Sequence, residues 1–294
     1  MVPEKLHGGG QRLLDLYAEM KCILPNINVA LVTCGDKGVD LDLLRSVFDE
    51  VYCLSDEQFS GDFISTLTFE SPNFDVIDLQ YHQAGALIGA IRRRWPSATL
   101  IFAPMESQIR TLKIAIAKNK QLVWRTWRRI LGLTFSALME AYYVIKADKV
   151  VTVSNSDRDE LAFLKKAGRV TCLPTCISPK LASLCGTLEV SEESATIVFF
   201  AYFGSRSNQE ALYWFIHEVH PVICRSLPKY QLRVVGHGID ESLLELCAIG
   251  QVEVVGSVPT IVDAFQGAAV GIAPALSGAG VRGKIHQYAA LGLP

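Results

Sequence analysis

The chain has little net charge, no paired cysteine motif and no long apolar run. Its 294 residues carry a formal net charge of −2, which argues against a protein that binds nucleic acid through its overall charge. Residues 1–10 are polar and glycine-rich and lack the apolar core of a signal peptide. No run of about 18 apolar residues occurs, so we expect no transmembrane helix.

The cysteines are eight in number and form no CxxC pair. Cys172 and Cys176 are separated by three residues that include a proline. Most of the cysteines lie in apolar segments that are typical of strands or helices. We therefore expect reduced, buried thiols in a cytoplasmic protein rather than a disulfide framework, and the spacing predicts no zinc site.

Apolar residues make up half of the chain and charged residues a fifth, which is enough to form substantial cores. Short apolar runs alternate with segments of helical periodicity, the pattern of βα units around parallel sheets. It predicts strands at residues 28–33, 74–79, 99–103, 149–153, 169–173, 196–203, 230–236, 252–255 and 270–273. It predicts helices at residues 13–20, 84–94, 208–226, 241–247, 261–266 and 283–291, and one from the cap cluster 154–157 through 166.

Two doubly wound α/β domains of similar build follow from this alternation. We assign residues 1–180 to the first domain, 181–195 to a linker, and 196–294 to the second domain. A glycine-dense loop, HGGGQR, precedes the first predicted helix with no strand before it, and no strand follows Pro294. We expect the chain to lack the first strand of its first domain and the end of its second.

The segment SGAGVRGKIHQ follows a predicted strand and begins a helix. A helix N-terminus offers free N–H groups and a positive dipole end, and Gly278 and Gly280 let a backbone approach closely. Arg282 and Lys284 add two positive charges. Gln287 can form hydrogen bonds with a diol such as a ribose. These residue types fit a diphosphate site, and they fit equally well a solvated loop with a cation pair.

Six segments of the C-terminal half resemble, in their order and spacing, glycosyltransferase family 4, whose members are retaining enzymes of the GT-B fold that use nucleotide-sugars. They are FFAYFGS with Asn208, WFIHEVHPVI, LRVVGHG, VEVVGSVP, AAVGIAP and GAGVRGKIHQYAALGLP. The N-terminal half is similar, less specifically, to the family's acceptor domain in FDVIDLQYH, FAPMESQIR, MEAYYVIKADKVVTVSNSDRDEL and LPTCIS. The resemblance implies two Rossmann-like domains with a cleft between them.

The resemblance also implies a donor site for a UDP- or GDP-sugar in the second domain, with no separate cofactor and no metal. The implied donor-binding residues are Gly204, Arg206, Val258, Gly278, Gly280, Arg282, Lys284 and Gln287. Cations and helix N–H groups would stabilise the diphosphate as it leaves, and its oxygen can take the acceptor's proton. The chain departs from the family where a Glu-x7-Glu pair falls on Ala279 and Gln287, and where a cleft histidine aligns with Met105.

Glu106 and His82 are the candidate catalytic groups on the acceptor side. Glu106 follows a strand and can orient a hydroxyl or act as a base, or it is a solvated loop acid. His82 can act in the same way, or it can be a structural histidine at the rim of the sheet whose hydrogen bonds are formed within the protein. Gly9 and Gly10 are expected to face the diphosphate or the acceptor, and we expect Glu140 to pair with a neighbouring cation.

A basic stretch lies between Ser107 and Met139, with seven Lys or Arg residues and no acid. Trp124 and Trp127 lie within it. A basic helix with tryptophans, residues 110–129, can lie on an anionic membrane, which would suit a lipid-linked acceptor. It can equally be a solvated surface helix, or one that packs on a partner.

We therefore expect a cytoplasmic glycosyltransferase, with a peripheral site on the inner face of the membrane as one option. We expect it to use a carbohydrate or a lipid-linked acceptor. Two alternatives stay open. One is a catalytically silent GT-B-like binding or scaffold subunit, which Gln287 and Met105 favour; the other is a nucleotide-sugar epimerase of the same fold.

Overall fold

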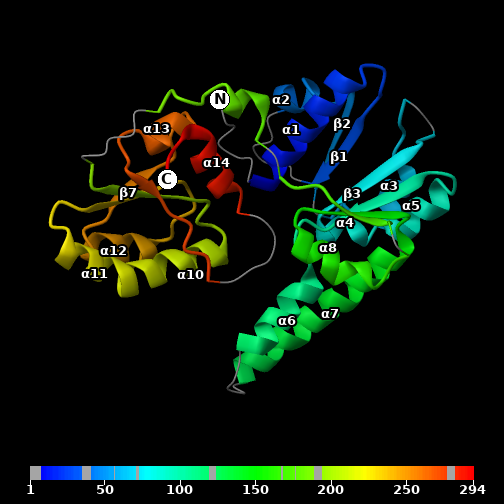
Figure 1. Cartoon of the computed structure of the whole chain (residues 1–294). Coiled ribbons are helices and arrows are strands. Elements are labelled where there is room, and N and C mark those ends of the chain that lie inside the picture. The colour runs from blue at the N-terminus through cyan, green and yellow to red at the C-terminus, as the bar shows by residue number, and fades with distance from the viewer. Residues whose placement is uncertain are drawn as a thin grey trace. The chain divides into compact units, whose positions relative to one another are not determined.

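The computed structural model divides the chain into two compact units, and we treat each by itself (Figure 1). The first contains residues 17–175, and the second contains the described residues of 176–278 and 282–294 together with α1 up to Leu16. The structure describes residues 8–34, 41–55, 57–70, 73–118, 124–166, 168–175, 177–188, 194–276 and 282–294.

The first unit is a succession of strand–helix units around two parallel sheets. One sheet has two strands in the order β1-β2, and the other has four in the order β3-β4-β5-β6. The elements are the part of α1 (Gly8–Ile23) from Tyr17 onward, β1 (Ala30–Cys34), α2 (Leu41–Arg45), β2 (Glu50–Leu54), α3 (Gly61–Thr66), β3 (Val76–Gln80), α4 (Tyr81–Gly85), α5 (Ile88–Arg94), β4 (Thr99–Ala103), α6 (Gln108–Lys118), α7 (Trp124–Lys146), β5 (Lys149–Thr152), α8 (Asn155–Ala162) and β6 (Val170–Cys172).

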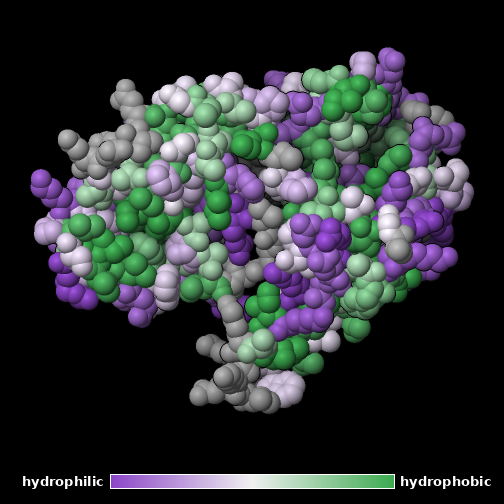
Figure 2. Space-filling view, in the orientation of Figure 1, coloured by the Kyte–Doolittle hydropathy of each residue, from purple (hydrophilic) through white to green (hydrophobic). Residues whose placement is uncertain are grey.

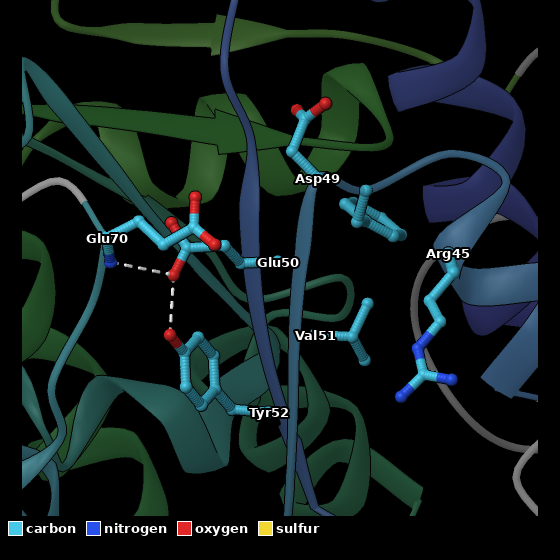
Figure 3. Close-up of a pocket in the computed structure, with 7 residues that line it drawn as sticks. Arg45, Asp49, Glu50, Val51, Tyr52 and Glu70 are labelled. Carbon is cyan, nitrogen blue, oxygen red and sulfur yellow. Dashed lines mark hydrogen bonds between the residues drawn. The ribbon is translucent and has the colours of Figure 1, made fainter.

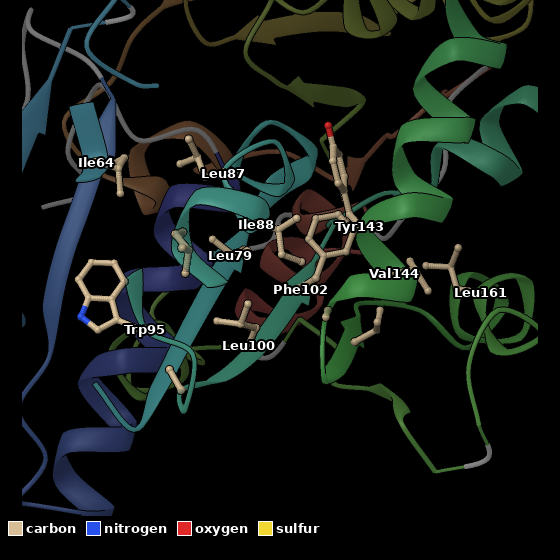
Figure 4. Packing of buried hydrophobic residues seen from close by; sticks show 14 of the residues in the cluster. Ile64, Leu79, Leu87, Ile88, Trp95, Leu100, Phe102, Tyr143, Val144 and Leu161 are labelled. Carbon is tan, nitrogen blue, oxygen red and sulfur yellow. The ribbon is translucent and has the colours of Figure 1, made fainter. Parts of the chain in front are cut away.

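The core of the first unit is built on β4, which lies between β3 and β5. A central parallel strand is covered on both faces, so its sequence is a continuous apolar run, TLIFA. Leu100 and Phe102 on this strand are completely buried, and they pack with Ile88 of α5 and with Tyr143 and Val144 of α7 (Figure 4). This packing holds the carboxyl ends of β3 and β4 next to each other.

The second unit is a four-stranded parallel sheet in the order β10-β7-β8-β9. Successive residues of β7 point to opposite faces of it. Phe199 packs in a cluster with Leu212, and Val198 packs in another with Phe265. The elements are α9 (Pro179–Ala182), β7 (Thr196–Phe200), α10 (Arg206–Trp214), a π-helical turn (Phe215–Val219), α11 (His220–Ser226), β8 (Gln231–Val235), α12 (Glu241–Ile249), β9 (Glu253–Gly256), α13 (Ile261–Phe265), β10 (Val270–Gly271) and α14 (Gly283–Leu291).

The expected α/β architecture with parallel sheets is confirmed, and several elements differ from the prediction. Strand β2 was not predicted. The helix expected to run through residue 166 ends at Ala162. The single helix predicted at residues 208–226 begins at Arg206 and is interrupted by the π-helical turn just before Pro221, which has no N–H to donate to the preceding turn.

The glycines of HGGGQR lie in the first turn of α1, not in a loop, since the helix begins at Gly8. The segment predicted as a linker begins with the last two residues of α9; its Leu188 belongs to the core of the second unit, and Leu181 and Leu184 pack against that core. The domain limits of 1–180 and 196–294 stay predictions. Within the described residues, no helix is both long and apolar enough to cross a bilayer.

The expectation of buried thiols is wrong for most cysteines. Of the seven that the structure describes, Cys247 is buried, Cys172 is intermediate and the others are exposed.

Candidate functional site

The carboxyl edge of the second sheet is formed by two turns that pack backbone against backbone. The first follows β7 and leads into α10, and the second follows β8. Gly236 has a φ of 137°, and a Cβ atom there would lie 1.8 Å from the Ala201 carbonyl oxygen. Gly238 has a φ of 80°, and its Cβ atom would lie 2.5 Å from the Gly204 nitrogen. Glycine is therefore required at both positions, and the predicted donor residue Gly204 lies directly against the turn that follows β8.

Arg206 is the first residue of α10, where a helix presents free N–H groups. Its side chain is 83% exposed, and its Nε atom lies 2.8 Å from Glu210 Oε1. An exposed ion pair of this kind contributes little, so Glu210 does not fix the guanidinium in place. Asn208, where the sequence predicted the helix to begin, lies in the first turn of α10, and its Nδ2 donates to the Tyr202 carbonyl oxygen at 2.8 Å.

Tyr288 fixes the second helix of the edge, α14, against the sheet. Its hydroxyl accepts a hydrogen bond from the Phe200 N–H and donates one to the Ile272 carbonyl oxygen, both at 3.1 Å. The ring lies so close to Gly271 that a Cβ atom there would meet it at 2.6 Å. Burial raises the pKa of the Tyr288 hydroxyl. These contacts join α14 to the ends of β7 and β10.

Lys284 lies in the first turn of α14 and points back over the end of β7. Its Nζ atom donates to Asn208 Oδ1 at 3.2 Å and lies 4.6 Å from the centre of the Phe199 ring. Burial, and then the charge of Arg282, lower the pKa of Lys284 to about 8. The structure thus brings the first turns of α10 and α14 together through a residue pair, Asn208–Lys284, that is 76 positions apart in the sequence.

The other predicted donor residues have mixed positions. Arg282 is the N-cap of α14 and is partly buried, and Gln287 is partly buried further along the helix. Val258 packs against the core cluster that contains Phe265. Gly278 and Gly280 lie outside the described residues. The functional role of every residue in this set stays a prediction.

The predicted acceptor-side residues lie at neighbouring strand ends of the first unit. Gln80, the last residue of β3, is opposite Ala103, the last residue of β4, so His82 and Glu106 both follow the carboxyl edge of one sheet. The His82 ring is 5.4 Å from the Tyr143 ring, its Nδ1 atom is buried with no hydrogen-bond partner, and burial lowers its pKa. Glu106 is exposed.

Backbone strain is concentrated at this same edge. Tyr81, directly after β3, has a φ of 69°, and Met105, just after β4, has a φ of 60°. Side chains rarely adopt this left-handed region, and such residues cluster at functional sites. The strain marks the edge as a second candidate site, with His82 and Glu106 in it.

Polar residues that the sequence did not single out also lie at this edge. Asp78 Oδ2 accepts hydrogen bonds from Tyr17 Oη at 2.7 Å and from Gln80 Nε2 at 2.6 Å. In the sequence, the signal that could have indicated Asp78 and Gln80 is the polar end of the apolar segment FDVIDLQYH. They place a carboxylate and an amide at the end of β3.

Gly9 and Gly10, predicted to face a ligand, lie in the first turn of α1. Their predicted role is not tested by this position.

The sequence suggested that Glu140 pairs with a neighbouring cation, but the structure shows that its carboxylate caps α6 instead. It is completely buried, and its Oε2 accepts hydrogen bonds from Ser107 Oγ at 3.0 Å and from the Ile109 N–H at 2.9 Å. Burial raises its pKa. A carboxylate at a helix N-terminus is stabilised by the free N–H groups and the dipole, so its role is to fix α6.

A surface pocket lies beside β2 in the first unit (Figure 3). Glu50 is one of the residues that line it, and Tyr52 Oη and the Glu70 N–H donate to its carboxylate. The hydrogen bond to Glu50 raises the pKa of Tyr52 to about 12. Glu70 and Asp49 also line the pocket; Asp49 is paired with Lys21 at 2.7 Å, and Arg45 is the cation among the lining residues, so Glu50 and Glu70 leave an excess of acid. This excess of negative charge disfavours a diphosphate, and Glu50 begins its strand, at the opposite edge from the one where α/β sheets bind ligands.

In the part of the chain that the structure describes, no group of three His, Cys, Asp or Glu side chains is placed to hold a metal ion.

Comparison with known proteins matches residues 194–294 to the family described as Glycosyl transferases group 1. No curated protein matches the chain. Among solved structures, Anabaena Alr3699/HepE in complex with UDP and glucose is 13% identical, with a TM-score of 0.64 over 99% of this chain and 77% of that one. The same Anabaena protein in complex with UDP gives a TM-score of 0.62 at 12% identity, with the same coverage.

Two further solved structures have TM-scores just above one half. The E. coli trehalose-6-phosphate protein bound with UDP-2-fluoro glucose is 11% identical, with a TM-score of 0.54 over 78% of this chain and 58% of that one. A putative UDP-N-acetylglucosamine 2-epimerase from Listeria monocytogenes is 12% identical, with a TM-score of 0.51 over 88% of this chain and 69% of that one. These likenesses confirm the expected fold, that of the GT-B glycosyltransferases.

Proposed function

We propose, from the premise that residues 194–294 are a glycosyl transferases group 1 domain, that this chain transfers a sugar from a nucleotide-sugar to an acceptor. The observation that carries the proposal is the position of Lys284. Its ammonium group is held at the carboxyl edge of the sheet between the first turns of α10 and α14, next to Arg282. Two helix N-termini and two cations at one edge are suited to a diphosphate.

The donor is a UDP- or GDP-sugar in this proposal. UDP is bound in the solved Anabaena structures of the same fold, and UDP-2-fluoro glucose in the E. coli one. The diphosphate lies against the N–H groups of α14, with Lys284 and Arg282 as its charge partners. With a pKa of about 8, Lys284 carries its proton at neutral pH, so its charge is available.

The reaction is helped mainly by electrostatic stabilisation. As the bond between the sugar and the phosphate breaks, negative charge develops on the diphosphate and positive charge on the sugar. Fixed cations and N–H groups in a partly dry environment stabilise the leaving group without having to reorganise. The diphosphate oxygen then accepts the proton of the acceptor hydroxyl, and retention of configuration is the expected outcome.

The acceptor, a carbohydrate or a lipid-linked sugar, belongs in this proposal to the first unit. His82 keeps a neutral imidazole because its burial lowers its pKa, so it can accept a proton or a hydrogen bond at neutral pH. Glu106 is the second candidate base or orienting group.

The test of donor binding is isothermal titration of the chain with UDP and GDP, comparing the wild type with Arg282→Ala. We expect the variant to lose about 1.5–3 kcal/mol of binding free energy, the range for a charge-assisted hydrogen bond. Arg225→Ala, which removes an exposed arginine on α11, is the matched control and should bind like the wild type. Equal affinity of Arg282→Ala and wild type removes Arg282 from the site.

A turnover assay separates the enzyme from the scaffold alternative. UDP release from a UDP-sugar in the presence of acceptor would support transfer. Tight UDP binding without any turnover of a panel of donors would favour the silent binding subunit, because Gln287 stands where the family has a glutamate. Conversion of a UDP-sugar into its epimer would favour the third option.

A further inference from the structure

The outward face of α7 carries an apolar stripe whose side chains are largely exposed. We define the α7 stripe as six residues whose exposed fractions lie between 44% and 65%: Trp127, Leu131, Phe135, Leu138, Tyr142 and Ile145. Figure 1 shows α6 and α7 side by side, running away from the four-stranded sheet, and Figure 2 shows hydrophobic residues at the surface of this region. The stripe runs from Trp127 to Ile145, and at a rise of about 1.5 Å per residue these two positions are about 27 Å apart along the helix.

The spacing of the stripe puts all six side chains on one side of the helix. At about 100° per residue they fall within an arc of about 80°. The buried residues Ala137, Glu140, Tyr143 and Val144 centre on the opposite side. That opposite side is the inward face of α7, which packs in the core of the first unit. A surface helix normally presents polar residues outward, so a second apolar face requires another partner.

The charges around the α7 stripe are of one sign. Arg128, Arg129 and Lys146 are exposed on α7, and by the same geometry Arg128 and Lys146 border the stripe on one edge. The acid of this helix, Glu140, is completely buried. From Ser107 to Met139 the sequence has no acid at all. The outward face is therefore both apolar and cationic.

Part of the basic stretch is already paired. Arg110 lies 3.6 Å from Asp157, and Lys113 pairs with Glu160, so α8 compensates these two charges. The side chains of Lys118, Lys120 and Arg125 lie outside the described residues. The expectation of a basic helix on a membrane thus rests on α7 and its stripe, not on the whole stretch 110–129.

We propose that the α7 stripe docks this protein onto an anionic lipid surface. A helix that lies in the interface buries an apolar face among acyl chains and places lysines and arginines among negative headgroups. Trp127, with its amphipathic ring, is suited to that boundary. A second copy of the chain is the competing occupant, but pairing two such faces brings like charges together. The docking does not depend on transferase activity.

The experiment is sedimentation of the chain with vesicles of phosphatidylcholine and with vesicles that contain phosphatidylglycerol as well. We expect binding to the anionic vesicles that weakens with salt, because headgroup attraction is screened. Phe135→Ser with Leu138→Ser should lower the partition coefficient at least about tenfold, since a tenfold change needs only about 1.4 kcal/mol. Both side chains are exposed, so the variant should fold, which circular dichroism checks.

Ile249→Ser is the matched control, because Ile249 is an isolated apolar residue at the end of α12 and is 82% exposed. It should bind vesicles like the wild type. Arg128→Gln with Lys146→Gln, which removes the two exposed cations that border the stripe, should weaken binding only to anionic vesicles.

No sedimentation with either vesicle, or sedimentation that the stripe variant leaves unchanged, overturns the proposal. A dimer in solution that Phe135→Ser with Leu138→Ser dissociates, in a protein that ignores vesicles, assigns the stripe to a second copy and also overturns it.

Discussion

Replacing Lys284 by methionine should move stability and nucleotide affinity in opposite directions. The lysine points its charge into a partly buried position against Phe199 and Asn208, where the protein disfavours the charged form. Methionine has a similar length and no charge. If the function of Lys284 is to bind a diphosphate, its replacement should stabilise the folded protein and lower the affinity for the nucleotide.

The magnitude follows from the pKa of Lys284. A fall from 10.5 to about 8 corresponds to about 3 kcal/mol against the charged form. The variant also loses the hydrogen bond to Asn208, worth about 1 kcal/mol, so we expect a net gain of about 1–2 kcal/mol. The midpoint of thermal unfolding should rise by roughly 2–6 °C. UDP affinity should fall by about 1.5–3 kcal/mol, or about 10- to 150-fold.

The sign of the pH dependence is fixed by the direction of the shift. Between about pH 8 and pH 10.5 the unfolded chain holds the Lys284 proton and the folded chain has lost it. The stability of the wild type therefore rises with pH across this window. Below about pH 8 the buried charge of Lys284 destabilises the folded protein to its full extent. The stability advantage of Lys284→Met should accordingly be largest at pH 7 and shrink by pH 9.5.

The assay is thermal unfolding and UDP titration of both proteins at pH 7 and pH 9.5. Wild-type affinity for UDP should fall as the pH rises through 8, and that of the variant should not. Lys229→Met, at an exposed lysine of the same unit, is the matched control and should change neither quantity. A variant that is less stable than the wild type at pH 7, or that binds UDP equally well, refutes the reasoning.

Two further predictions concern the frame of the site. Gly236→Ala should destabilise the second unit by about 3 kcal/mol or more in chemical unfolding, because its Cβ atom would lie 1.8 Å from the Ala201 oxygen. The control is Gly267→Ala, which has a φ of 70° and open space around it and should cost only about 1–2 kcal/mol. Equal costs for the two variants would contradict the close packing of the turns. Tyr288→Phe should lose about 1–3 kcal/mol, because the Phe200 N–H is left without its hydrogen bond; an unchanged midpoint of unfolding would remove Tyr288 from its anchoring role.

Much of the fold was predictable because buried parallel strands are continuous apolar runs. β4 and β7 were found this way, and the limits of α14 agree with the prediction. β2 was missed because, among the strands that the structure describes, it pairs with β1 alone, and because it mixes Glu50 and an exposed Cys53 with its apolar residues. The pattern of a buried strand is absent from such an edge.

Local preferences also failed where other effects were stronger. Three glycines in a row predict a loop, and yet they lie in the first turn of α1. Leu14, in the next turn of the same helix, is buried. Tertiary packing of a helix can exceed the low intrinsic propensity of glycine.

The candidate site was predictable in its composition but not in its contacts. Glycines and cations before a helix pointed to Arg282 and Lys284. The partner of Lys284, Asn208, could not be found from spacing, because the two meet only when α14 packs across the sheet through Tyr288. The strained backbone at Tyr81 and Met105 leaves no mark in the sequence at all.

The most direct test of the account is a crystal structure of the chain with UDP. We predict that the diphosphate oxygens lie within hydrogen-bonding distance of Lys284 Nζ and of the N–H groups in the first turn of α14. Clear density for UDP at another place, with Lys284 still bonded to Asn208 and no phosphate beside it, would contradict the account.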